Sequence, residues 1–448
     1  MSQITVIFNF KGKIANIQFN AKDKMNNICE KFISQLKEDC SKLYFKYNGN
    51  LIKEELKLEE QINERDRISC KMNIIVEEGI KREINKKIIN LEDNINKEKM
   101  NKTKNKNMNN KKNENYIIAE INIKESDLNS DIKIINSYEQ YKRDINFEKR
   151  EEEYENEKEL KENCEIKIND NKIKFSYFNK FKKAGKYTIK YLFKKNLINT
   201  GYMFGNCKSL SSINLSYFSA QNVTNMRYMF LHCDSLTNIN LSNFNTQNVI
   251  DMKGMFEGCS SLTTINLSNF NTKKVIDMSY MFNKCILLRN LNLSNFNTET
   301  VIYMNYMFSM CNSLISINLS NFNTKNVKDM SYMFYECNLL RILNLSNFNT
   351  ENVINMNNMF YNCHSLISLN LSNFNAQNVT DMKYMFYNCH SLISLNLSNF
   401  NAQNVIDMSS MLYNCHSLIS LDLSNFNAQN VTYMSSMFSG YKSLKLLI

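Results

Sequence analysis

The chain has 448 residues, 43% of them apolar and 22% charged, which is the ordinary composition of a soluble protein with room for more than one domain. Its formal net charge is +11, but residues 201–448 carry only +2 of that charge. The basic residues therefore form no single patch along the chain. This distribution argues against a specific nucleic-acid-binding protein, because such proteins concentrate lysine and arginine on one surface.

No apolar stretch approaches the ~20 residues that cross a bilayer, so we expect no transmembrane segment. The N-terminus, MSQITVIFNFKGK, also lacks the continuous hydrophobic region of a secretory signal. We therefore expect a cytoplasmic protein, with export to the cell surface by a non-classical route as the alternative. In a reducing compartment the 13 cysteines should be thiols rather than disulfides.

Residues 1–78 show the pattern of a small α+β domain. Residues 3–10 and 14–20 alternate polar and apolar side chains around Gly12, which predicts a hairpin. Apolar residues at helical spacing between 23 and 36 predict a helix, and the segments LYFKYNGN and RISCKMNIIV predict two further strands. This ββαββ order, with YFKYNGNLIKEELKLEEQI in its second half, resembles the ubiquitin-like β-grasp fold.

Two departures from ubiquitin bear on what this domain could do. The C-terminal Gly-Gly that ubiquitin conjugates is missing, because the last strand continues through VEEGIKRE into more chain. The resemblance also aligns Lys46 and Lys71 with the apolar receptor-binding patch of ubiquitin. An unpaired lysine opposes burial against an apolar receptor, so we expect these two residues to favour an acidic partner surface.

Two further regions precede the second half of the chain. Residues 79–115 are rich in Lys and Asn and lose their hydrophobic periodicity, which predicts a solvated linker. A basic linker could also touch RNA or acidic lipid, but it lacks the interleaved aromatic residues that stack on bases. Residues 116–200 contain alternating segments such as GKYTIKYLF and are interpreted as a β-rich domain that caps the C-terminal half of the chain.

A strict repeat begins at Gly201 and continues to the end of the sequence. Tyr441 takes the tenth place in a cysteine column, and a Met-Phe pair recurs in the same phase. The nine cysteines stand 26 residues apart at Cys207, Cys233, Cys259, Cys285, Cys311, Cys337, Cys363, Cys389 and Cys415. A fixed period without insertions indicates one supersecondary unit stacked on copies of itself, here about ten coils over residues 201–448.

Within one coil, SLTNINLSNFN has the LxxLxL spacing that supplies a short strand. The following NVIDMKGMFEGC places five residues on one inward face: Val249, Met252, Met255, Phe256 and Cys259. This spacing fits a helical or 3₁₀ return, and a second short strand is the alternative. A single coil cannot bury enough apolar surface to order 26 residues, so the coils should be stable only as a stack.

The segment SLTTINLSNFNTKKVIDMSYMFNKC resembles the BspA-like leucine-rich repeats of microbial and protist surface proteins. The resemblance covers residues 201–448 and implies a right-handed leucine-rich-repeat-type solenoid. It also implies a surface or adhesion role without enzymatic activity. One departure is a phenylalanine column, which begins at Phe218, Phe244 and Phe270 and replaces the usual buried amide ladder.

Candidate chemistry in the repeats is weighed against packing. Each coil has one cysteine and no CxxC pair, which favours a buried structural thiol over a metal ligand. His364, His390 and His416 form a short column inside duplicated segments, and duplication alone accounts for it. We expect no catalytic residue, no metal and no cofactor.

The strand residues that alternate with inward leucines should face outward and form the candidate interaction surface. They are asparagines in one phase of the repeat, and stacked amides of this kind can hydrogen-bond along an array. The column comprises Asn240, Asn266, Asn292, Asn318, Asn344, Asn370 and Asn396.

The sequence thus predicts a non-enzymatic scaffold for protein–protein interactions, with the identity of its partner left open. One alternative is a ubiquitin-pathway adaptor, in which residues 1–78 dock on the machinery and the repeats hold a client. A second alternative is a surface or adhesion protein of the BspA-like type. The final segment, SLKLLI, has no polar cap, so we also expect self-association through this edge.

Overall fold

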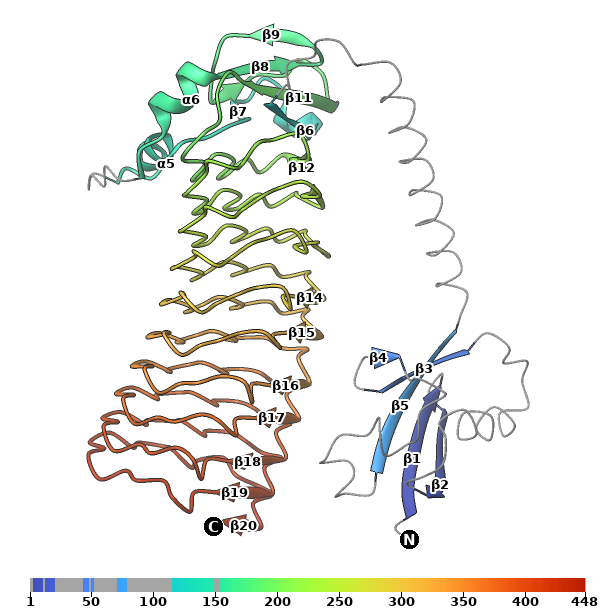
Figure 1. The fold of residues 1–448 in the computed structure, drawn as a ribbon, viewed down its shortest axis with the longest axis vertical. Helices are drawn as coiled ribbons and strands as arrows, with labels where there is room; N and C mark the ends of the chain where they lie inside the picture. Colours follow the sequence, from blue (N-terminus) through green and yellow to red (C-terminus); the bar gives the residue numbers. More distant parts are fainter. Residues whose placement is uncertain are drawn as a thin grey trace. The chain divides into compact units, whose positions relative to one another are not determined.

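The computed structural model describes the backbone of residues 3–10, 13–20, 43–47, 50–51, 71–78, 115–147 and 154–447. Side chains are described for residues 115–147 and 154–447. The chain divides into two compact units, Met1–Lys112 and Asn113–Ile448, and Figure 1 shows the elements of each. The predicted linker lies, apart from its last residue, outside the described residues.

The first unit contains one five-stranded sheet in the order β2-β1-β5-β3-β4. Strand β1 pairs antiparallel with β2 and parallel with β5, and β3 pairs antiparallel with β5 and β4. The strands are β1 (Gln3–Phe10), β2 (Lys13–Asn20), β3 (Leu43–Tyr47), β4 (Asn50–Leu51) and β5 (Lys71–Glu78). The helix expected between 23 and 36 lies outside the described residues, and the ubiquitin-like identification stays a prediction.

The second unit begins with a β-rich region that shares a sheet with the repeats. Its three central strands, β6, β8 and β11, alternate buried and partly exposed residues, as in β11, where Ile189, Tyr191 and Phe193 point into the core. The elements are β6 (Asn115–Ile123), η1 (Glu125–Asp127), β7 (Ile132–Lys133), α5 (Tyr138–Asp144), α6 (Glu157–Asn163), β8 (Cys164–Ile168), β9 (Asn171–Ile173), β10 (Phe178–Asn179) and β11 (Gly185–Phe193).

This β-rich region closes the N-terminal end of the repeat stack. Strand β6 pairs antiparallel with β12 (Leu210–Asn214), and β12 pairs parallel with β13 (Asn238–Asn240), so one six-stranded sheet runs from one region into the other. Two buried amides complete the junction: Asn136 Nδ2 donates to the Gly205 carbonyl and Asn156 Nδ2 to the Gly201 carbonyl, both over 2.7 Å. The preceding region therefore supplies hydrogen-bond partners for backbone groups of the first coil.

The repeats form a solenoid of about nine turns with two columns of backbone pairing (Figure 1). One column is made of short parallel strands whose partners lie 26 residues apart, and the other of nine single bridges that run from Asn199–Asn225 to Asp407–Tyr433. The remaining strands are β14 (Asn290–Asn292), β15 (Ser316–Asn318), β16 (Ile342–Asn344), β17 (Ser368–Asn370), β18 (Ser394–Asn396), β19 (Ser420–Asp422) and β20 (Leu446–Leu447).

The return segment of each coil is a succession of tight turns rather than a helix or a second strand. Met255 N donates to Met252 O over 3.2 Å, which closes a turn within the coil. Met252 N and Phe256 N instead donate to Asp277 O and Met281 O of the next coil, both over 3.0 Å. Bonds within a coil and bonds between coils thus alternate along the return.

The turns require left-handed backbone at two positions per coil, four residues apart. Gly254 and Gly258 fill them in one coil, but Tyr280 and Lys284 fill them in the next, with φ of 60° and 58°. A non-glycine residue in this region costs roughly 1–2 kcal/mol. Bonding and packing between coils therefore hold the return segment against a local backbone preference.

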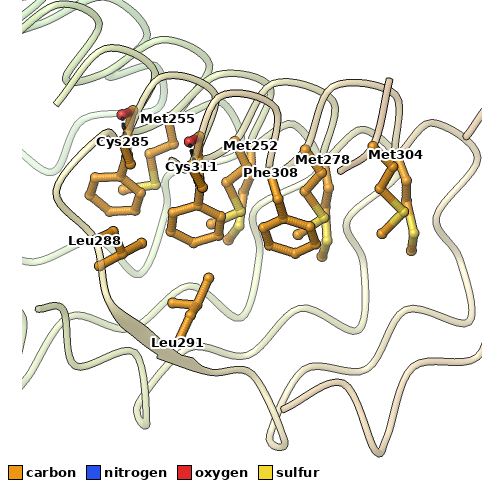
Figure 2. Packing of buried hydrophobic residues seen from close by; sticks show 14 of the residues in the cluster. Met252, Met255, Met278, Cys285, Leu288, Leu291, Met304, Phe308 and Cys311 are labelled. Atoms are coloured by element: carbon orange, nitrogen blue, oxygen red, sulfur yellow. Dashed lines mark hydrogen bonds between the residues drawn. The ribbon is translucent and has the colours of Figure 1, made fainter. Parts of the chain in front are cut away.

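The core is a set of columns in which each side chain packs on its own equivalent in the neighbouring coils (Figure 2). Met255, Phe256 and Cys259 are completely buried, as are their counterparts in most other coils. The ring of Phe282 stacks on those of Phe256 and Phe308, with centroids 5.7 and 5.9 Å apart. Because every layer forms one face of the next, the buried residues make one continuous cluster.

We expect replacement of Phe256 by Ser to unfold the neighbouring coils together with its own. The substitution removes a fully buried ring stacked on both sides, and comparable truncations cost about 3–5 kcal/mol. Hydrogen exchange measured by mass spectrometry should show lost protection in both flanking coils. Phe256→Leu is the matched control, because Leu412 occupies the equivalent position. A loss of protection confined to one coil would contradict the coupled stack.

Substitution of Lys284 by Gly should stabilise the solenoid by up to about 1 kcal/mol, because it relieves a left-handed backbone at an exposed position. Lys273→Gly in the same coil is the control, because the φ of Lys273 is not positive. Glycine there only adds conformational entropy to the unfolded chain, which should destabilise the folded solenoid by about 0.5–1 kcal/mol. Denaturant unfolding of both variants measures the difference. Equal destabilisation by the two substitutions would show that the left-handed turn carries no cost.

Candidate interaction surface

Six of the seven predicted asparagines end a solenoid strand, Asn266 lies at the same phase in a coil without a strand, and all seven side chains are exposed. Each Oδ1 accepts the backbone N–H two residues ahead, as Asn240 does from Ser242 over 3.0 Å and Asn396 from Ser398 over 2.8 Å. These are Asx turns, which reverse the chain after the strand. Within the solenoid no hydrogen bond joins the seven amides to one another, so the expected ladder does not form at this phase.

An amide ladder does form at another phase of the repeat. Asn388 Nδ2 donates to Asn362 Oδ1 over 2.9 Å, and Asn414 Nδ2 donates to Asn388 Oδ1 over 3.1 Å. These three residues occupy the second left-handed position of their coils, a conformation that asparagine tolerates better than most residues. The sequence analysis expected stacked amides at the column of Asn240 and did not predict this one.

The other two predicted surface residues belong to the first unit. Lys46 lies in β3 opposite Ile75, and Lys71 begins β5 opposite Thr5. Their side chains lie outside the part of the chain for which side chains are described. Their preference for an acidic partner stays a prediction.

The cysteine column is buried, and the eight thiols from Cys233 to Cys415 each have a hydrogen-bond partner in an earlier coil. The Sγ atoms of Cys285 and Cys311 donate to the carbonyls of Phe256 and Phe282, in both cases over 3.2 Å (Figure 2). The Phe256 carbonyl oxygen also accepts the backbone N–H of Cys259. The Cys285 thiol therefore donates to the second lone pair of the same oxygen. Sequence reasoning identified packing but missed this bond, for which the invariant single cysteine per coil was the signal.

Burial also suppresses the reactivity of these thiols. It raises the pKa of Cys311 to about 12, and Cys363 and Cys415 have the same shift for the same cause. Only the thiolate is a nucleophile or a metal ligand, so the column is chemically inert in the folded state.

We expect iodoacetamide at pH 8 to leave the cysteine column of the native chain unlabelled. The thiols are buried and their pKa lies far above that pH, so the reactive thiolate is both scarce and inaccessible. Peptide mapping after unfolding in guanidinium should show complete labelling at the same positions, which is the control. Labelling of any solenoid cysteine at the rate of a free thiol would contradict the assignment.

The three histidines stack along the surface. Ring centroids lie 4.9 Å apart for His364 and His390 and 5.1 Å apart for His390 and His416. Nδ1 of His364 lies 3.1 Å from the Asn388 carbonyl, so the proton sits on that nitrogen. Burial, followed by the two flanking imidazoles, lowers the pKa of His390. In residues 115–147 and 154–447, no group of three or more histidine, cysteine or acidic side chains could hold a metal ion.

Stacked tyrosines cover a large part of the return turns and were not predicted from the sequence. We call this surface the tyrosine face; it consists of Tyr280, Tyr306, Tyr332, Tyr335, Tyr361, Tyr384, Tyr387 and Tyr413, all half-buried. Tyr306 stacks on Tyr280 and Tyr332 with centroids 4.6 and 4.3 Å apart and ring planes within 7°. The recurrence of tyrosine at two fixed phases, before the second methionine and after the phenylalanine of each coil, was the signal for it.

The first tyrosine of the same column, Tyr202, is covered by helix α5. Tyr202 contacts Tyr138 and Tyr141 of α5, with centroids 5.4 and 4.6 Å away, and also contacts Tyr228 at 5.1 Å. With Leu231 these residues form an apolar cluster separate from the main core. At Tyr202 this column of tyrosines therefore already forms an intramolecular interface with α5.

The last described coil exposes apolar side chains. Met434, Phe438, Leu446 and Leu447 have exposed fractions of 46%, 44%, 49% and 60%. Self-association through this edge stays a prediction. Among the helices of the described residues, none has the length and apolar character that crossing a membrane requires.

These features define a repeat solenoid with inert buried columns and a patterned surface. Residues 173–286, 259–368 and 336–447 match the family described as Mycoplasma protein of unknown function, DUF285. The matches cover more than half of the chain, which therefore belongs to this family.

No curated protein matches the chain. Among solved structures, it is similar to a chain of the "Crystal structure of TLR13-ssRNA13 complex", with 18% identity and a TM-score of 0.25. The match covers 53% of this chain and 41% of that one, so this chain spans less than half the length of the solved one.

Proposed function

We propose that this protein is a non-enzymatic scaffold whose solenoid presents an extended surface to a protein partner. The observation that carries the proposal is the tyrosine face, in which seven of the eight half-buried rings stack along successive coils and Tyr384 packs edge-on against two of them. Aromatic residues are enriched where proteins bind one another, because a rigid ring contributes contact area at little entropic cost. An extended solenoid surface is the usual binding site in repeat proteins.

The residue types capable of chemistry have structural roles in the repeats. The solenoid thiols donate to backbone carbonyls, and Nδ1 of His416 lies 2.6 Å from the Gly440 carbonyl. The strand asparagines complete turns, as Asn318 does for Ser320. These assignments support binding rather than catalysis as the work of the solenoid, without a cofactor.

Two alternatives keep specific support. The sheet order β2-β1-β5-β3-β4, with its parallel β1–β5 pair, favours a ubiquitin-like first unit and hence an adaptor in the ubiquitin pathway. In that case Lys46 and Lys71 would meet an acidic surface. The resemblance of the repeats to BspA-like proteins favours a surface or adhesion role, which requires export in place of the cytoplasmic location that we propose.

The test is photo-crosslinking in cells with the full chain. A photoreactive amino acid is placed at Tyr306 on the tyrosine face, at exposed Ile315 beside the strands, or at Lys46 in the first unit. We expect a discrete protein partner to be captured from a solenoid position. Capture only from Lys46 would favour the adaptor alternative and contradict binding by the repeats.

The captured partner then serves as the probe for affinity. We expect it to bind the full chain and the Asn113–Ile448 unit with equal affinity, because that unit has its own core. Isothermal titration of both proteins measures this. A loss of more than tenfold without Met1–Lys112 would assign binding to the first unit and refute the proposal.

A further inference from the structure

The chain shows how its own tyrosine column is covered at one end. Helix α5 presents Tyr138 and Tyr141, which lie one turn apart on the same side of the helix, to the ring of Tyr202. Beside it, the Arg227 guanidinium lies 3.9 Å from the ring centre of Tyr154. The contact is built from aromatic stacking and a cation–π interaction rather than from the main core.

A glycine ends the covered part of the column. The Tyr228 ring lies over Gly254, where a Cβ would come within 2.1 Å of a ring carbon. Because Gly254 lacks a side chain, Tyr228 can lean into the place that a tyrosine would occupy in that coil. The rings of Tyr202 and Tyr228 are accordingly tilted by 40° to each other.

Beyond Gly254 the same column resumes, and within residues 115–147 and 154–447 no helix lies over it. Tyr280, Tyr306 and Tyr332 stand at the phase of Tyr202 and Tyr228, and their ring planes are parallel to within 7°. These three rings are half-buried, as Tyr228 is, whereas Tyr202 under α5 is only 7% exposed. The two segments have the same side chains on the same backbone phase and differ in whether they are covered.

We propose that Tyr280, Tyr306 and Tyr332 are the docking site for a helix of a partner protein that carries two aromatic residues one turn apart, as α5 does. This proposal rests on the scaffold function above and names its surface and the kind of partner. Tyr202, which α5 covers, stands at the same phase of the repeat as the proposed site and shows that this column accepts such a helix.

The charges around the site add a basic residue to the description of the partner. Burial raises the pKa of Tyr280, and the nearby carboxylates of Glu257, Asp329 and Asp277 raise it further. Lys253 Nζ also lies 5.6 Å from the centre of the Tyr280 ring, so a helix that approaches this segment meets three carboxylates against one ammonium, which favours positive charge on the helix. Helix α5 itself carries Lys142 and Arg143 in its last turn. A partner helix with two aromatic residues followed by lysine or arginine fits both the rings and the charge.

The test uses the full chain and a helix-constrained peptide of the α5 sequence SYEQYKRDI, with Tyr141 replaced by Trp. The protein has no tryptophan, so the fluorescence of the peptide reports binding alone. The variant combines Tyr280→Asn, Tyr306→Asn and Tyr332→Asn. Asparagine suits the left-handed backbone of these positions, and Asn358 already occupies the equivalent place in the next coil.

We expect saturable binding to the wild-type chain and at least about a tenfold weaker Kd for the triple variant. Tyr303→Asn is the matched control: Tyr303 is 45% exposed in the coil of Tyr306 but on the bridge column, where Asn225 and Asn355 are its equivalents. This control should change Kd by less than about twofold. Thermal unfolding and hydrogen exchange of both variants establish that they retain the fold.

Three results of the peptide experiment would overturn the proposal. The first is absence of saturable binding, and the second is equal binding by the triple variant and the wild type. The third is concentration-dependent dimerisation of the wild type that the triple variant loses, since the occupant would then be a second copy. A partner captured on the solenoid that binds the triple variant unchanged overturns this site and leaves the scaffold function standing. Absence of any partner on the solenoid refutes the scaffold function itself.

Discussion

Backbone pairing between successive coils is the constraint on which the rest of this solenoid depends. Strand residues such as Asn290 and Ser316 pair in register, and the return segment bonds across coils through donors such as Met252 and Phe256. A buried N–H or carbonyl left without a partner is costly, so one inserted residue would shift every bond of its coil. The period of 26 residues therefore runs without interruption through the repeats.

The same constraint explains a large part of the unusual composition. The Thr246 hydroxyl, the Asn248 amide and the Cys259 thiol each donate to a carbonyl of a neighbouring coil. Small polar side chains at fixed phases thus complete the hydrogen bonds that the two backbone columns leave open. These polar side chains and thiols therefore join one coil to the next instead of forming a reactive site.

Alignment of the coils also produces the surface. Identical residues one coil apart must stack, so Tyr306 lies on Tyr280 and His390 on His364. Stacking fixes the rings and leaves an ordered aromatic face, which suits recognition of a protein better than catalysis. Tyr138 and Tyr141 of α5 cover Tyr202 in the same column, whereas no helix of residues 115–147 and 154–447 covers the tyrosine face.

The sequence by itself determined the repeat, its inward set and the exposure of Asn240 and its equivalents, because polarity and spacing alone decide which side chains face a shared core. It could not determine the return, since a helix and left-handed turns place Met252, Met255 and Phe256 inward at the same spacing. Only tertiary structure decided that backbone, through bonds to the next coil. Tertiary structure also decided that the tyrosines form one face, because the ring contacts and the packing of α5 on Tyr202 join residues far apart in the chain.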